Sequence, residues 1–187
     1  MDYTLTEIET IVRQLLGDFS KTLIPGDIFT YGTSSVFTLS ESNPIAITKI
    51  LVGDVEIGDS EYSFDNDTKV TINKSMNSGD SVEIQYTYYP NYSSEEIQNY
   101  IKAAIVHISA CNYTTFIVEN STIYPEPSRE EENLIAIISS ILIEPDNKSY
   151  SLPDITIRMP SDLPTNQKIR QTISSFKKNS HGTFFVG

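Results

Sequence analysis

The pattern of apolar and polar positions is most distinctive in residues 128–145, which read SREEENLIAIISSILIEP. Ser128 and Glu131 have the spacing of a capping box, in which the serine oxygen accepts a backbone N–H and the glutamate reaches back to the serine amide. Pro145 is expected to end the helix, because the residue before a proline is pushed out of helical geometry. Six large aliphatic side chains between these marks point to nearly all sides of a helix: Leu134, Ile135, Ile137, Ile138, Ile141 and Leu142. A helix that is apolar on every side must be surrounded, so we expect this segment to be the central helix.

A buried strand is the alternative for this run, because a short β-branched stretch is also compatible with a sheet. The cap and the length of the segment favour the helix. No membrane span is expected, since residues 134–143 are well short of the ~20 apolar residues needed to cross hydrocarbon.

Three further segments have helical periodicity. The first starts at Thr4, forms a capping-box spacing with Glu7 and ends near Gly17. The second starts at Ser93, and the last follows Pro164. Their apolar positions recur at helical intervals: Ile8, Ile11, Val12, Leu15 and Leu16 in the first; Ile97, Ile101, Ala104, Ile105 and Ile108 in the second; Ile169, Ile173 and Phe176 in the last.

Between the first two helices, residues 27–89 change to a period of two, with turn residues every few positions. Short antiparallel strands are predicted at residues 36–39, 45–52, 55–57, 62–64, 69–73 and 82–88. Pro25-Gly26-Asp27 is predicted to be a turn that marks a module boundary. Residues 114–127 are predicted to be a linker, and residues 152–159 a single extended strand.

The sequence therefore predicts an α+β protein with two domains. Residues 1–26 and 90–187 would form a helical domain, a small bundle of about four helices around the central apolar helix, with a C-terminal arm. Residues 27–89 would form an antiparallel β domain, sandwich or barrel-like, inserted after the first helix.

The composition argues against several classes of function. The 187 residues carry a formal charge of −12, which argues against a sequence-blind DNA-binding surface, because such a surface needs clustered Lys and Arg. Cys111 is the only cysteine, so no internal disulfide is possible. The polar, acidic N-terminus lacks the pattern of a signal peptide.

Candidate catalytic and metal motifs are weak. His107 and Cys111 are four residues apart on one helix, but two ligands are too few for a metal site. Asp65-Asn66-Asp67 resembles the start of a calcium loop, yet Val70 and Met76 occupy its glycine and glutamate positions, so a hairpin turn is favoured. Without a Gly-rich phosphate loop or a nucleophile elbow, we expect no enzyme, no metal and no cofactor.

Tyrosines 86, 88, 89 and 92 are compatible with two interpretations. They could line a sugar or protein site, because Tyr is favoured in contact patches. Strand packing explains the alternating members equally well, so both alternatives stay open.

The C-terminal segment differs from the rest of the chain. From Thr165 onward it has no acid and four cations, Lys168, Arg170, Lys177 and Lys178, which leaves −16 on the remainder when their +4 is taken from −12. Phe184, Phe185 and Val186 follow. Such a segment either packs on its own domain or docks on another chain, and we favour docking. The candidate partner-binding residues are Lys177, Lys178, Phe184, Phe185 and Val186.

The order of these elements resembles the head–tail connector (neck adaptor) proteins of tailed bacteriophages. The resemblance covers residues 4–17 and 92–178 and is sharpest at residues 124–143, where YPEPSREEE leads into the apolar helix. The strand pieces VGDVEI (52–57) and NSGDSVEIQY (77–86) resemble β domains of phage structural proteins. The β insertion is larger than the simple hairpin of the minimal family members.

The resemblance implies a virion protein of the neck, made in the host cytoplasm, that forms a ring, typically of twelve copies. It would bind the portal protein on one side and a tail or stopper protein on the other, and DNA would pass through without specific binding. The competing hypothesis is a binding module whose β domain recognises glycan or a host surface, and an enzyme is the third option.

Overall fold

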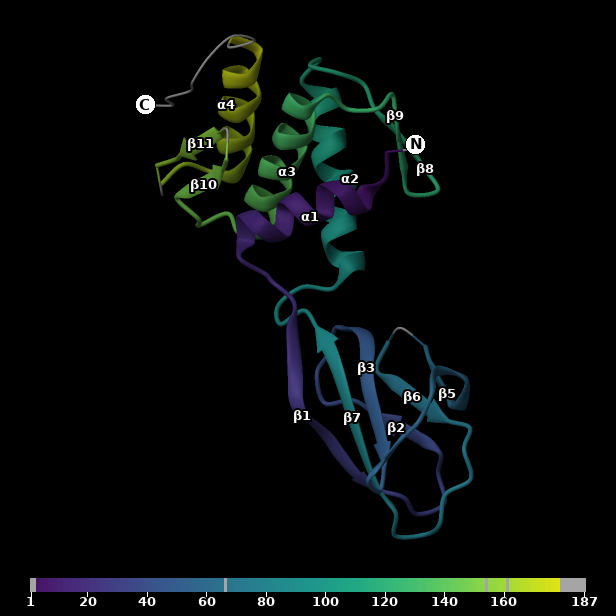
Figure 1. The fold of residues 1–187 in the computed structure, drawn as a ribbon. Helices are drawn as coiled ribbons and strands as arrows, with labels where there is room; N and C mark the ends of the chain where they lie inside the picture. The colour runs from purple at the N-terminus through teal and green to yellow at the C-terminus, as the bar shows by residue number, and fades with distance from the viewer. Residues whose placement is uncertain (1–2, 66, 154, 161, 179–187) are drawn as a thin grey trace. The chain divides into compact units, whose positions relative to one another are not determined.

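The computed structural model describes residues 3–65, 67–153, 155–160 and 162–178. In this part of the chain there are four α-helices and several antiparallel sheets, which confirms the α+β class (Figure 1). The chain forms two compact units: a helical unit, Met1–Gly17 with Ser94–Gly187, and a β unit, Asp18–Ser93. The β unit thus begins before residue 27.

α1 (Leu5–Leu16) forms where its capping box and apolar spacing predict it. The Thr4 backbone N–H donates to Glu7 Oε2 at 2.8 Å, which satisfies one of the free amides at the helix start. Leu5, Ile8 and Val12 are fully buried on one face. Gly17 ends the helix with φ +68°, a left-handed conformation that favours glycine.

α3 (Arg129–Ile143) is the predicted central helix, and the strand alternative is wrong. Ser128 Oγ accepts the Glu131 N–H at 3.4 Å, and Glu131 Oε2 accepts the Ser128 N–H at 2.9 Å. Every residue from 134 to 141 is buried. Ser139 and Ser140 tolerate this burial because their hydroxyls donate to the backbone carbonyls four residues earlier, at 2.8 and 2.9 Å.

The walls around α3 come from the other three helices. α3 packs against α1, α2 (Ser94–Ala110) and α4 (Thr165–Lys178) (Figure 1). α2 and α4 contribute the apolar faces that their periodicity predicts. Ile97, Ile101 and Ile108 of α2 are buried, as are Ile169 and Ile173 of α4. The continuous burial of α3 follows from this contact on several sides.

Two hairpins of the helical unit differ from the predictions. β8 (Ile117–Glu119) and β9 (Thr122–Tyr124) pair where a linker was predicted. Asn120 and Ser121 between them have φ +47° and +69°, as a two-residue type I′ turn requires. β10 (Ser149–Leu152) and β11 (Ile155–Arg158) also pair, so the prediction of one extended strand over residues 152–159 is wrong.

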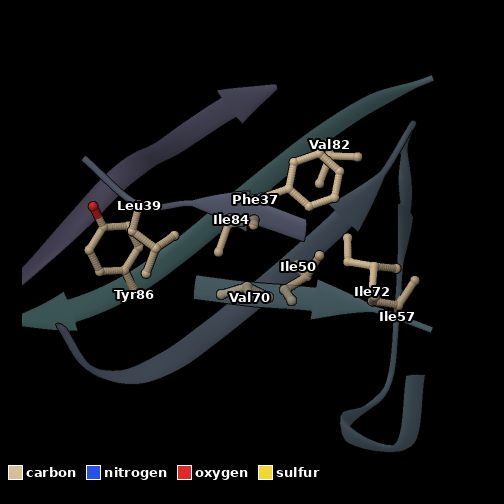
Figure 2. Packing of buried hydrophobic residues seen from close by; sticks show 9 residues of the cluster. All are labelled: Phe37, Leu39, Ile50, Ile57, Val70, Ile72, Val82, Ile84 and Tyr86. Carbon is tan, nitrogen blue, oxygen red and sulfur yellow. The ribbon is translucent and has the colours of Figure 1, made fainter. Parts of the chain in front are cut away.

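The β unit contains two antiparallel sheets. The four-stranded sheet has the order β1-β7-β3-β4, and the three-stranded sheet has the order β2-β6-β5. The strands are β1 (Lys21–Thr30), β2 (Val36–Thr38), β3 (Pro44–Val52), β4 (Val55–Glu56), β5 (Tyr62–Phe64), β6 (Lys69–Ile72) and β7 (Ser81–Tyr88). Both sheets contribute to one apolar core, shown in Figure 2: Phe37, Leu39, Ile50, Ile57, Val70, Ile72, Val82, Ile84 and Tyr86.

The predicted turn at Pro25-Gly26-Asp27 is wrong, because these residues lie inside β1. The register of β1 on β7 shifts between Leu23 and Asp27, so the local irregularity is a bulge in a strand. A Cβ at Gly26 would lie 2.1 Å from the Ile84 carbonyl oxygen. Gly26 is therefore required by the close approach of two strands. In the sequence alone, such a glycine looks the same as a glycine in a turn.

Candidate interaction surfaces

The predicted partner-binding residues lie at and beyond the end of α4. Lys177 is exposed, and its Nζ donates to the Cys111 carbonyl at 2.6 Å, which ties the end of α4 to the end of α2. Lys178 is the last residue of α4. Phe184, Phe185 and Val186 lie outside the described residues, so their role stays a prediction.

Lys168, one of the four cations counted after Thr165, is not available at the surface. Its side chain is 2% exposed, and its ammonium group donates to the Pro145 carbonyl just beyond the end of α3. A carbonyl at a helix C-terminus carries partial negative charge and suits a cation. Among the described side chains of α4, Arg170 and Lys177 are the exposed cations.

An exposed apolar surface lies on the β8–β9 hairpin, which the sequence analysis missed. Ile117 and Tyr124 are directly opposite each other in the register and therefore share one face. They are 58% and 45% exposed, and we call them the hairpin face. On the opposite side of β9, Ile123 is buried. The β-branched and aromatic residues on both sides of Asn120-Ser121 were the signal for this hairpin.

The hairpin is held in place from three directions. Thr114 Oγ1 donates to Glu131 Oε1 at 2.7 Å, which ties the root of the hairpin to α3. The Leu5 N–H donates to the Ser121 carbonyl, and the Ile123 N–H donates to the Tyr3 carbonyl, each at 2.8 Å. The hairpin face is therefore supported by two helices and by the N-terminal segment.

Carboxylates surround this region. Glu119, Glu126 and Glu130 are exposed. Burial, followed by the charge and hydrogen bond of Glu132 and by the charges of Glu7 and Glu126, raises the pKa of Tyr3, whose carbonyl accepts the Ile123 N–H of β9. The hairpin face is thus an apolar patch in a negative neighbourhood.

One buried charge pair lies on α1 and is hydrogen-bonded to side chains of α2. Arg13 Nη2 lies 2.8 Å from Glu9 Oε1, and both side chains are less than 10% exposed. Gln98 Nε2 donates to the second oxygen of Glu9 at 3.0 Å, and Arg13 also donates to Ser94 Oγ at 3.3 Å. The pair is satisfied within the helical unit, which indicates a structural role.

In the β unit, Tyr86 is fully buried, so its interpretation as a surface-recognition residue is wrong. Its hydroxyl donates to Asp27 Oδ2 at 2.9 Å and accepts the Glu41 N–H at 3.1 Å. Burial raises the pKa of Tyr86. Tyr88, Tyr89 and Tyr92 are partly buried.

A hollow of about 540 Å³ lies instead on the three-stranded sheet, lined by Val36, Ser63, Phe64, Asp65, Lys69 and Thr71. It combines two hydroxyls, a carboxylate and an ammonium group with two apolar side chains. Asp65 Oδ1 accepts the N–H groups of Asp67 and Lys69 at 3.0 and 3.1 Å, which confirms a turn there and lowers the pKa of Asp65. The hollow can accept a polar ligand of hydroxyl-rich character.

His107 and Cys111 are both half-buried near the end of α2. Within residues 3–65, 67–153, 155–160 and 162–178, no three His, Cys, Asp or Glu side chains are placed to share a metal ion. None of the helices described is long and apolar enough to span a bilayer. The sequence matches no protein-family model, and a search of curated proteins finds no significant similarity.

Proposed function

We propose that this protein is a head–tail connector of a tailed bacteriophage, a structural virion protein of the neck adaptor type. It would form a ring, typically of twelve copies, between the portal and the tail or stopper protein, and DNA would pass through the ring. The proposal includes the finer architecture: a small bundle of four helices around α3, with the antiparallel β unit inserted after α1.

The burial of α3 carries the proposal. Residues 134–141 are all buried, and α3 packs against the other three helices. Its apolar side chains therefore serve packing, and the groups left for other molecules lie on the surface: the hairpin face, the acids around it and the cationic end of α4. Exposed apolar residues beside complementary charges are typical of proteins that assemble.

The charge of the chain supports a passive role toward DNA. Apart from the C-terminal segment, the chain carries −16, and acids that face a channel would repel phosphate. Packaged DNA would then slide without adhering. Replacing channel-lining acids by Lys in the phage should slow DNA ejection, and an unchanged ejection rate would count against this role.

Negative-stain imaging of the purified protein, alone and mixed with a portal, tests the proposal directly. We expect rings in at least the mixed sample, stacked on one face of the portal. Single particles of monomer size in both samples would contradict it.

A second test concerns the C-terminal arm. A chain that lacks residues 182–187 should fold normally, because the described core ends before them, yet it should no longer join the portal assembly. A pull-down that recovers normal amounts of the shortened chain would count against the arm.

The hollow on the three-stranded sheet favours one alternative, a glycan-binding module. Ser63, Thr71, Asp65 and Lys69 offer hydrogen-bonding groups beside the apolar side chains of Val36 and Phe64. A glycan array is the cheapest test. Binding that disappears in Asp65→Ala and Lys69→Ala variants would favour this alternative, and rings without glycan binding would favour the connector.

A further inference from the structure

We propose that the hairpin face, together with the outer edge of β8, is the docking site for the C-terminal segment, residues 177–187, of a second copy of this chain. The inference rests on the proposed function, because it names the contact that would join neighbouring copies in a ring.

The edge of β8 is available for strand addition. β9 pairs with β8 on one side, and on its other side it contacts the segment around Thr4, where the Ile123 N–H donates to the Tyr3 carbonyl. β8 has no second partner strand among the described residues. Since β8 is an edge strand, its outward N–H and C=O groups can bind an extended segment.

The side chains beside this edge are apolar and fixed in position. Ile117 and Tyr124 are exposed on one face of the hairpin, and the hairpin is anchored through Thr114, Ser121 and Ile123. A docking segment would cover apolar area without first having to order the site, so little conformational entropy would be lost on the receiving side.

The C-terminal segment has the matching chemistry. Residues 183–186 read TFFV, a β-branched and aromatic composition typical of strands. Side chains alternate along a strand, so either Phe185, or Phe184 with Val186, would lie beside Ile117 and Tyr124. The positive charge of Lys178 would favour the acids around the hairpin, Glu119, Glu126 and Glu130, while Lys177 stays bonded to the Cys111 carbonyl of its own chain.

The partner is a second copy because the two complementary surfaces occur on the same chain. A cationic aromatic segment that binds an acidic apolar surface elsewhere on an identical molecule makes a head-to-tail contact, and repetition of that contact closes a ring. The nine residues after Lys178 span at most about 30 Å, a reach that suits a directly adjacent copy.

A complementation experiment with two variants of the full protein tests this. The arm variant lacks residues 182–187 and keeps the site, and the site variant, Ile117→Thr with Tyr124→Thr, keeps the arm. Sedimentation velocity should show that each alone associates at least ~10-fold more weakly than the wild-type chain. An equimolar mixture should form a dimer, because one arm meets one intact site.

Val106→Thr, which changes a 66% exposed apolar residue of α2, is the matched control and should associate like the wild-type chain. Thermal unfolding checks that each variant is folded. Should Ile117→Thr disturb the hairpin, Glu119→Lys with Glu126→Lys gives a second variant, whose weaker association should be relieved by high salt.

Monomers in the mixture would overturn the inference. They would mean that the segment docks on its own chain or on another protein, and not on a second copy. If the wild-type chain still forms rings on a portal, the proposed function stands and only the docking site is wrong. Failure of the wild-type chain both to associate and to bind a portal would contradict the proposed function as well.

Discussion

The two units bury similar apolar side chains but distribute them differently along the chain. In the helical unit, the buried centre is a continuous segment, residues 134–141 of α3. In the β unit, the core residues are spread from Phe37 to Tyr86 over two sheets (Figure 2). The centre of the first core is therefore one continuous segment that the other helices cover, whereas the second core has no such segment and forms only when distant strands pair.

The largest expected effects on stability come from core truncations, and each should destabilise only the unit that carries it. Ile138→Ala in α3 and Ile84→Ala in β7 both truncate a fully buried side chain, and each should lower the free energy of unfolding of its own unit by about 2–5 kcal/mol. Hydrogen exchange followed by mass spectrometry should show faster exchange in the altered unit only. If both variants accelerate exchange throughout the chain, the two units unfold together and the comparison fails.

Gly26→Ala should break the β unit at a single contact. The new methyl group would lie 2.1 Å from the Ile84 carbonyl oxygen, so β1 and β7 would have to separate. We expect a loss of about 1–3 kcal/mol in the free energy of unfolding of the β unit, measured by urea denaturation. Gly32→Ala is the control, because a Cβ there meets nothing within 4 Å. Equal losses in both variants would contradict a steric cause.

The helical unit was the more predictable of the two. Ser128 with Glu131 and Thr4 with Glu7 define helix starts by local chemistry, and the apolar spacing of each helix confirms them. In the β unit, the inner strands were predictable because of their alternation. β1 was not, since it is an edge strand whose Ile24 and Ile28 are exposed and whose Pro25-Gly26 resembles a turn.

The candidate surfaces were predictable only in part. The cationic composition after Thr165 is visible in the sequence, but the burial of Lys168 depends on where α3 ends relative to α4. The hairpin face was missed because Asn120-Ser121 is a less obvious turn than Asn-Gly. Exposure of Ile117 and Tyr124 depends on tertiary packing, which periodicity alone does not reveal.

Lys168→Met tests whether the hydrogen bond from Lys168 to the Pro145 carbonyl stabilises the helical unit. The methionine keeps the apolar stem but leaves the partly buried Pro145 carbonyl without its donor, so we expect a loss of about 1–3 kcal/mol in the free energy of unfolding. Arg170→Met, at an exposed position of the same helix, should change it by less than about 0.5 kcal/mol. Thermal and urea denaturation of the two variants measure the difference. Equal effects would show that Lys168 behaves as a surface residue.

Glu131→Gln should have the smallest effect and a characteristic pH dependence. Partial burial acts to raise the pKa of Glu131, but the hydrogen bonds from Thr114 and Ser128 outweigh it, and the net result is a lowered pKa. A carboxylate with a lowered pKa stabilises the folded state above its ordinary value of 4.5, and this contribution is lost as the pH falls through the folded-state pKa. At pH 7 we expect a loss of about 1 kcal/mol, as for other helix caps.

Urea denaturation of the wild-type chain and the Glu131→Gln variant at a series of pH values measures this dependence. The difference between them should shrink as the pH falls below about 4.5, because the protonated glutamate then resembles the amide. Ser128→Ala removes one of the hydrogen bonds that lower the pKa of Glu131, so its effect should also shrink as the pH falls below about 4.5. A constant difference between Glu131→Gln and the wild-type chain down to pH 3 would mean that packing, and not the carboxylate, stabilises the start of α3.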